Sequence, residues 1–201
     1  MTTTAQMSDT LRHGRVTRLL HAGVALAVIW QLGVSLAMQG PRGTTPGDTL
    51  FTMHSYVGLA ALGLIVLFWL NLLARRVGTD AGALFPWFSA ERRAALWADS
   101  RAQLGALTRL RLPDYVEGSA LSSAVHGLGL LLMTLMAASG TASWFTEPSA
   151  DAGVFENVHK LFANLVWVYL IAHAGLAVLH HLRGEASLSE MWSLRGRTDG
   201  E

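Results

Sequence analysis

Four long apolar blocks constrain what this chain can fold into more than any other feature of its sequence. They run from about residue 16 to 38, 51 to 74, 120 to 145 and 155 to 182. Each is long enough to cross a hydrocarbon layer about 30 Å thick, which takes about 20 apolar residues in a helix. We therefore expect an all-α fold. It would be an integral membrane four-helix bundle in which residues 1–201 form one domain, with a long cytoplasmic loop at 77–119 between the second and third helices.

The composition excludes several classes of protein. Hydrophobic residues make up 51% of the 201 positions and charged residues only 14%, which is typical of a membrane protein. The chain has no cysteine, so a disulfide, an iron–sulfur cluster, a thiolate-bound metal and a covalently attached c-type haem are all excluded. The net charge of +1 gives no reason to expect nucleic-acid binding. A tightly held redox centre would have to use His, Met or carboxylate ligands.

The basic residues are distributed unevenly between the two ends of the helices. Only Arg42 and Lys160 belong to one end. Thirteen arginines belong to the other: Arg12, Arg15, Arg18, Arg75, Arg76, Arg92, Arg93, Arg101, Arg109, Arg111, Arg183, Arg195 and Arg197. Because an excess of Lys and Arg marks the cytoplasmic side, we expect both termini in the cytoplasm. In a bacterium the short loops would then face the periplasm from a multi-pass inner-membrane protein.

The long loop contains a further helical pattern. Ser89 can cap a helix with Glu91 in its first turn, and Trp97 and Leu104 follow among arginines. A basic amphipathic helix of this kind can lie on the anionic inner leaflet. It can equally be a solvated linker helix or a docking surface for a partner.

Histidines fall at two matched depths in the apolar blocks. His21 lies 17 residues from Met38, and His173 lies 18 residues from Phe155, which places both about 26 Å from the periplasmic helix ends. His54 and His159 both lie close to that periplasmic end. Two neutral imidazoles at one level can hold a b-type haem iron from opposite sides. The pattern therefore predicts two haem b sites, with iron ligands His21, His54, His159 and His173.

Cationic side chains lie near both predicted sites. Arg15 and Arg18 precede His21 and would serve the propionates of the cytoplasmic haem, while Lys160 and Arg42 would serve the periplasmic one. Arg15 and Arg18 can also be simple cytoplasmic anchors of the first helix. The small residues near the ligands would admit a macrocycle or serve close helix packing; these are Gly23, Gly58, Ala172 and Gly175.

The remaining histidines have weaker assignments. His126 competes with His21 as partner of His173, or it hydrogen-bonds a propionate, a quinone or another helix. His180 and His181 lie at the cytoplasmic interface, where polar groups are ordinary, although they can also bind a quinone head group. The first three blocks contain no Asp or Glu, which argues against a metal transporter, a proton pump and a cation channel.

These motifs together resemble the prokaryotic cytochrome b561 family, which includes the b-type cytochrome subunits of nickel–iron hydrogenases. The resemblance covers all four blocks. It rests on R-x-x-H ending at His21, M-H-x-x-x-G around His54, H-G-L-G-L-L-L from His126, H-x-x-x-A-N-L from His159, H-A at His173 and H-H at His180 and His181. The pattern of the fourth block is the most specific.

The resemblance implies a four-helix membrane bundle with two haems b. It implies that His21 and His173 bind the cytoplasmic haem, and that His54 and His159 bind the periplasmic one. Members pass electrons between a quinone pool and a partner subunit, a soluble carrier or, in one branch, superoxide. The superoxide:quinone oxidoreductase activity of that branch is a further alternative for this chain, although its loop at 77–118 is longer than in the compact superoxide-oxidising members.

Three functions are consistent with these observations. The first is a dihaem cytochrome, a quinone-linked oxidoreductase component that carries electrons between ubiquinone or menaquinone and a periplasmic redox protein. The second is a membrane anchor for a hydrogenase-like or dehydrogenase-like catalytic subunit, docked through residues 89–110 or Gly184–Glu201. The third is a haem-free structural or transport protein whose histidines only pack or form hydrogen bonds.

Overall fold

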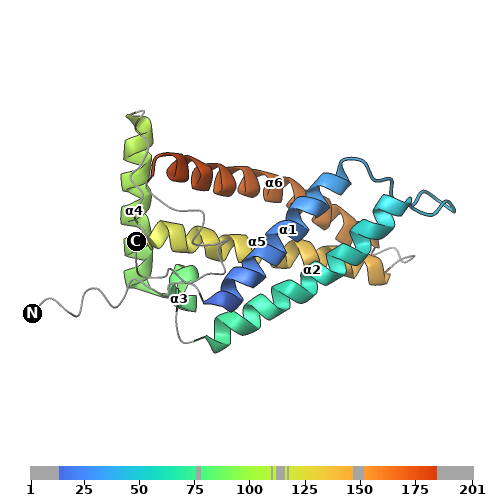
Figure 1. Cartoon of the computed structure of the whole chain (residues 1–201), viewed down its shortest axis with the longest axis horizontal. Helices are drawn as coiled ribbons and strands as arrows, with labels where there is room; N and C mark the ends of the chain where they lie inside the picture. Colours follow the sequence, from blue (N-terminus) through green and yellow to red (C-terminus); the bar gives the residue numbers. More distant parts are fainter. Residues whose placement is uncertain are drawn as a thin grey trace, which may run out of the picture. The chain divides into compact units, whose positions relative to one another are not determined.

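The computed structural model describes residues 14–75, 78–109, 111, 116, 118–146 and 152–184. Within these residues the chain is helical and forms no strand, although Arg42 and Thr45 pair in an isolated bridge. Four helices are long and apolar enough to cross a membrane: α1 (Arg15–Ser35), α2 (Thr49–Ala74), α5 (Ala120–Thr146) and α6 (Ala152–Leu182) (Figure 1). The predicted all-α fold with four candidate membrane helices is therefore confirmed.

The segment between α2 and α5 contains three helical elements among its described residues. It contains α3 (Ala81–Leu84), the short 3₁₀ helix η1 (Pro86–Phe88) and α4 (Ala90–Thr108). Ser89 caps α4 by accepting a hydrogen bond from the Arg92 amide, and Glu91 lies in the first turn, as the sequence predicts.

The first long helix is shorter than its apolar block. Helix α1 ends at Ser35 rather than at Met38, because the amides of Leu36 and Ala37 donate to the carbonyl oxygens of Gly33 and Val34 in a turn.

Large apolar side chains lie on the outside of the long helices. Val168 and Ile171 of α6 are each 67% exposed, and Leu26 of α1 is 62% exposed. A helix that is apolar all round is stable only inside a large core or in lipid. Since these apolar side chains are mostly exposed, they fit a lipid environment, and the chain is a multi-pass membrane protein.

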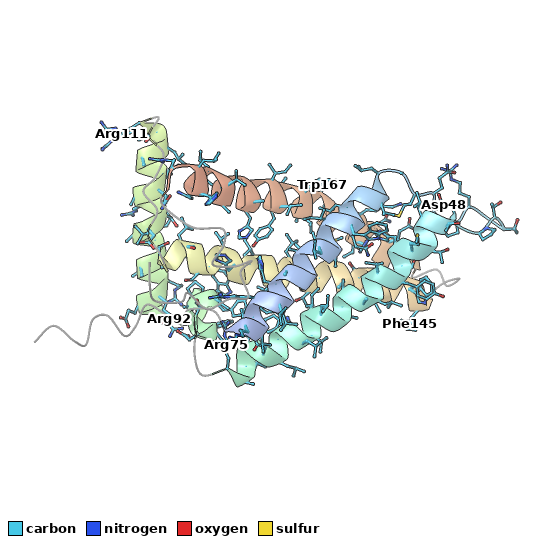
Figure 2. All side chains as sticks on the ribbon, viewed as in Figure 1. Asp48, Arg75, Arg92, Arg111, Phe145 and Trp167 are labelled. Carbon is cyan, nitrogen blue, oxygen red and sulfur yellow. The ribbon has the colours of Figure 1, made fainter. Side chains whose placement is uncertain are left out.

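The chain divides into two compact units. The bundle unit consists of Leu19–Leu70 and Leu130–Gly175, and the loop unit contains the described residues of Met1–Arg18, Asn71–Gly129 and Leu176–Glu201. The core of the bundle unit takes one buried residue from each long helix: Leu32, Ile65, Met133 and Val166. Trp167, labelled in Figure 2, packs against this cluster. All four predicted iron ligands belong to the bundle unit.

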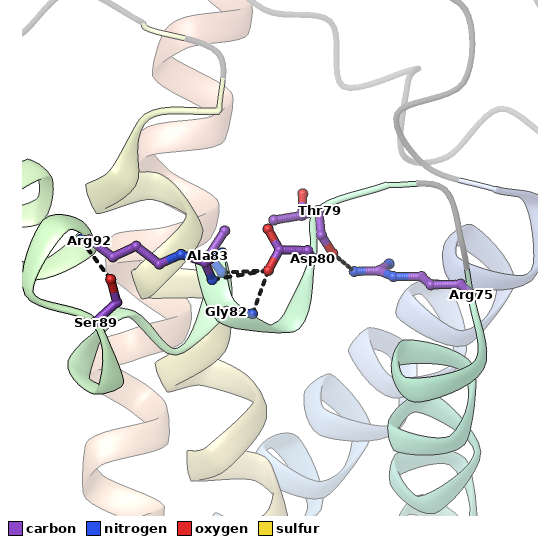
Figure 3. A network of polar contacts seen from close by, with 7 residues as sticks. All are labelled: Arg75, Thr79, Asp80, Gly82, Ala83, Ser89 and Arg92. Atoms are coloured by element: carbon purple, nitrogen blue, oxygen red, sulfur yellow. Dashed lines mark hydrogen bonds and ion pairs between the residues drawn. The ribbon is translucent and has the colours of Figure 1, made fainter.

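A polar network joins residues between Arg75 and Arg92 in the loop unit (Figure 3). Asp80 caps α3 by accepting hydrogen bonds from the amides of Gly82 and Ala83, and it pairs with Arg92 of α4 at 3.1 Å. Arg75, just after α2, donates to the carbonyl oxygen of Thr79. These contacts join the end of α2, the short α3 and the first turn of α4.

The pH dependence of this network follows from Asp80. Burial works against ionisation, but the hydrogen bonds from Gly82 and Ala83 and the charge of Arg92 outweigh it, so the pKa of Asp80 lies below its ordinary value. The stabilisation is therefore present above the unfolded pKa and is lost as pH falls through the lower folded pKa. We expect the amides of α3 to exchange hydrogen faster in Asp80→Asn than in wild type at neutral pH, and equally fast in strong acid. A constant difference at all pH values would contradict this.

A close backbone approach joins α3 to α5 within the loop unit. A Cβ atom added at Gly127 would lie 2.0 Å from the carbonyl oxygen of Leu84, which is too close for any side chain. We expect Gly127→Ala to separate the two helices and destabilise the protein by about 1–3 kcal/mol, measured as a lower thermal midpoint in detergent. Gly63→Ala is the control, because a Cβ there meets nothing within 4 Å. Equal midpoints for the two variants would refute the prediction.

The two sides of α4 have different surroundings. Asp99 accepts a hydrogen bond from the Leu121 amide at 3.3 Å, so this side contacts the first turn of α5. Trp97 is 59% exposed, with the Arg101 guanidinium 4.8 Å from its ring centre. Positions 97 and 99 are about 200° apart around a helix. The aromatic and basic side of α4 is therefore not the side that contacts α5.

Candidate haem site

Two of the predicted ligands, His54 and His159, lie next to each other in the bundle unit. His54 lies near the start of α2 and His159 near the start of α6, and the centres of their rings are 6.1 Å apart. The ring planes make an angle of 85°. An imidazole nitrogen binds a first-row metal at about 2.0 Å, so two rings on opposite sides of one ion have centres about 6 Å apart. By this spacing, His54 and His159 could hold one haem iron between them.

The surroundings of His159 determine which ring nitrogen can bind a metal. Its Nδ1 lies 3.0 Å from the carbonyl oxygen of Met136 and 3.4 Å from Oγ of Ser139. A carbonyl oxygen only accepts, so Nδ1 carries the proton and donates. The lone pair is then on Nε2. A hydrogen bond of this kind, at the nitrogen opposite the metal, is usual for ligand histidines.

His54 is held through its backbone. The side-chain amide of Gln31 in α1 donates to the carbonyl oxygen of His54 at 2.8 Å. Gly58 makes room for this contact, because a Cβ there would lie 2.8 Å from Nε2 of Gln31. The Nδ1 atom of His54 is buried and has no hydrogen-bond partner among the described residues. A buried ring nitrogen without a partner is costly, so the His54 ring is left with a nitrogen that a bound group could satisfy.

The other predicted pair is less closely defined. His21 in α1 and His173 in α6 both belong to the bundle unit, and both are half-buried. The His173 ring stacks on Tyr169, one turn earlier in the same helix, with ring centres 5.3 Å apart. Gly23 lies against the Leu64 side chain, with 3.3 Å between an added Cβ and that side chain. Gly23 therefore serves packing of α1 on α2.

The predicted propionate partners lie at exposed or half-buried positions. Arg15 is exposed and Arg18 half-buried at the start of α1. Lys160 follows His159 directly and forms an ion pair with Glu156 at 2.6 Å. Arg42 is exposed in the turn between α1 and α2, where its backbone pairs with Thr45.

The remaining histidines of the described helices lie in α5 and at the end of α6. The ring of His126 is exposed, and its Nδ1 lies 2.7 Å from the carbonyl oxygen of Ser122, one turn earlier in α5. His180 and His181 lie in the last turn of α6. No group of three or more His, Cys, Asp or Glu residues suited to a metal ion occurs within the described ranges.

Sequence reasoning missed the residues that contact His54 and His159. Gln31, Met136, Ser139 and Gly140 come from α1 and α5, neither of which supplies a ring of this pair. Gln31 is an isolated amide inside an apolar block, which was the one available signal. Met136 acts through its backbone, and no side-chain pattern reveals that role.

Comparison with known proteins identifies the family. The sequence model described as prokaryotic cytochrome b561 matches residues 12–194. No curated protein and no solved structure gives a significant match. The matched range includes all four candidate membrane helices and both predicted histidine pairs. The chain therefore belongs to the prokaryotic cytochrome b561 family, whose members are membrane b-type cytochromes of electron transfer.

Proposed function

We propose that this chain is a dihaem cytochrome that transfers electrons across the bacterial inner membrane, between the quinone pool and a periplasmic redox partner. One haem b would be bound by His54 and His159, and the other by His21 and His173. The observation that carries the proposal is the closeness of His54 and His159, whose ring centres are 6.1 Å apart. Its support is the hydrogen bond that leaves Nε2 of His159 available as a ligand.

The helix register supports a second site toward the other end of the bundle unit. His173 follows His159 by 14 residues on α6, which is about 21 Å along the axis. On α1, His21 precedes Gln31, the residue that touches His54, by 10 residues or about 15 Å. The side chains of His21 and His173 each lean toward the N-terminus of their own helix. The helices α1 and α6 run in opposite directions in a four-span chain. This tilt of the side chains therefore brings the two rings closer to the same depth in the membrane.

The chain itself supplies binding and electrostatics. A haem with two histidine ligands supplies one-electron chemistry at an iron that has no open coordination position. The apolar helices keep water from the rings. The cations Arg15 and Arg18 at one end, and Lys160 and Arg42 at the other, would neutralise propionates. The ammonium group of Lys160 would then contact both a propionate and its ion-pair partner Glu156.

The topology belongs to the proposal as well. With both termini in the cytoplasm, the His54–His159 site would lie near the periplasm and the His21–His173 site near the cytoplasm. The arginine distribution supports this orientation. A periplasmic partner would then exchange electrons with the outer haem, and residues 1–201 would act as one domain.

A second candidate function is that of a membrane anchor for a catalytic subunit of a hydrogenase-like or dehydrogenase-like complex. The observation that favours it is the exposed Trp97 side of α4, because Trp and Arg are common at the centres of interfaces. The other predicted docking segment is the tail Gly184–Glu201, of which residues 185–201 lie outside the described part of the chain.

Purified protein tests the proposal directly. We expect two haems b per chain, and reduction of both by a ubiquinol or menaquinol analogue. Protein that lacks haem would refute the proposal and favour a haem-free structural role. Two haems that quinol cannot reduce, unless a catalytic subunit is added back, would favour the anchor function.

A further inference from the structure

The ring of His159 is fixed by a short stretch of α5. Ser139 is buried, with 7% exposure, and its hydroxyl lies 3.4 Å from Nδ1 of His159. The same hydroxyl donates to the carbonyl oxygen of Met136 at 3.1 Å. His159 donates to that carbonyl oxygen as well, at 3.0 Å. The hydroxyl, the carbonyl and the ring nitrogen thus form a closed set of contacts that restrains rotation of the imidazole.

Gly140 restrains the same ring sterically. A Cβ at this position would lie 2.9 Å from Cε1 and 3.0 Å from Nδ1 of His159. The α5 backbone therefore lies directly against the imidazole. Unlike the end of a long side chain, this ring is held at Nδ1 by Met136 and Ser139, so it cannot move aside without losing those contacts.

We propose that Ser139 and Gly140 are positioning residues that hold the His159 ring nearly perpendicular to the His54 ring. The inference rests on the proposed haem function and extends it to the electronic structure of the periplasmic haem. The angle between the planes is 85°, close to the largest value that two planes can make. All but a small rotation of the His159 ring about the line between the two rings therefore reduces the angle.

The angle has a spectroscopic consequence. In a low-spin ferric haem, two parallel axial imidazoles separate the energies of the iron orbitals that lie along and across the ring planes. Perpendicular imidazoles leave these orbitals nearly equal in energy, and the electron paramagnetic resonance signal then has an unusually large maximum g value. We expect such a signal from one haem of the oxidised wild-type protein.

Variants at these two positions test the inference. We expect Ser139→Ala to retain both haems while the large-g signal broadens and moves to lower g, because the ring is less restrained. Ser139→Thr keeps the hydroxyl and should show the same large-g signal as the wild-type protein. Gly140→Ala should move it further, since the added Cβ displaces the ring. The signal of the other haem should not change in any variant.

Matched controls separate ring positioning from general packing. Ser123→Ala removes another buried hydroxyl of α5, and Gly63→Ala adds a methyl group where nothing lies within 4 Å. Both should keep the wild-type signal. If Ser139→Ala and Gly140→Ala also keep it, with two haems bound, the inference is overturned and the proposed function stands. Wild-type protein without haem overturns both, while two haems without a large-g signal overturn the inference alone.

Discussion

Replacement of His159 by Leu is expected to halve the haem content of the purified protein. The ring centre of His159 lies 6.1 Å from that of His54, so the variant removes one of two axial ligands from the proposed periplasmic site. Leucine offers no donor atom, and His54 alone would have to hold the macrocycle. The measurement is haem b per chain, together with a redox titration that should show one component in place of two.

Double variants test whether His54 and His159 share one haem. His54→Leu combined with His159→Leu should lose no more haem than either single variant, because both changes affect the same site. His159→Leu combined with His173→Leu should lose both haems. Asn157→Leu is the control, since Asn157 is an exposed polar residue on the same helix. Two haems per chain in His159→Leu would show that the ligand assignment is wrong.

Much of the fold is readable from the sequence, because the bilayer imposes a simple length requirement. The second apolar block ends near Ala74, where α2 ends, and the third begins near Ala120, where α5 begins. The end of α1 was less predictable, since Leu36 to Met38 are apolar and extend the block although the helix stops at Ser35. That end depends on backbone turns onto Gly33 and Val34, which hydrophobicity does not report.

The site was predictable only in part, for a physical reason. His54 and His159 could be paired because both lie near the N-terminal ends of their helices, and equal depth follows from helical rise alone. The restraints on their rings could not be predicted, because they depend on which helix faces align. Ser139 and Gly140 read as ordinary small residues for helix packing. Only the tertiary structure brings them against the His159 ring.

Replacement of His173 by Leu is expected to remove the other haem, whereas replacement of His126 by Leu should remove none. His173 belongs to the bundle unit, as His21 does, and its ring is held by stacking on Tyr169. His126 belongs to the loop unit and is exposed, with Nδ1 at 2.7 Å from the Ser122 carbonyl oxygen of its own helix. His126→Leu is thus a matched control, since it is the same substitution in another membrane helix. The measurement is haem b per chain, with the large-g signal of the His54–His159 haem as an internal standard. Loss of haem from both His126→Leu and His173→Leu, with two haems retained in His21→Leu, would make His126 the partner of His173 in place of His21.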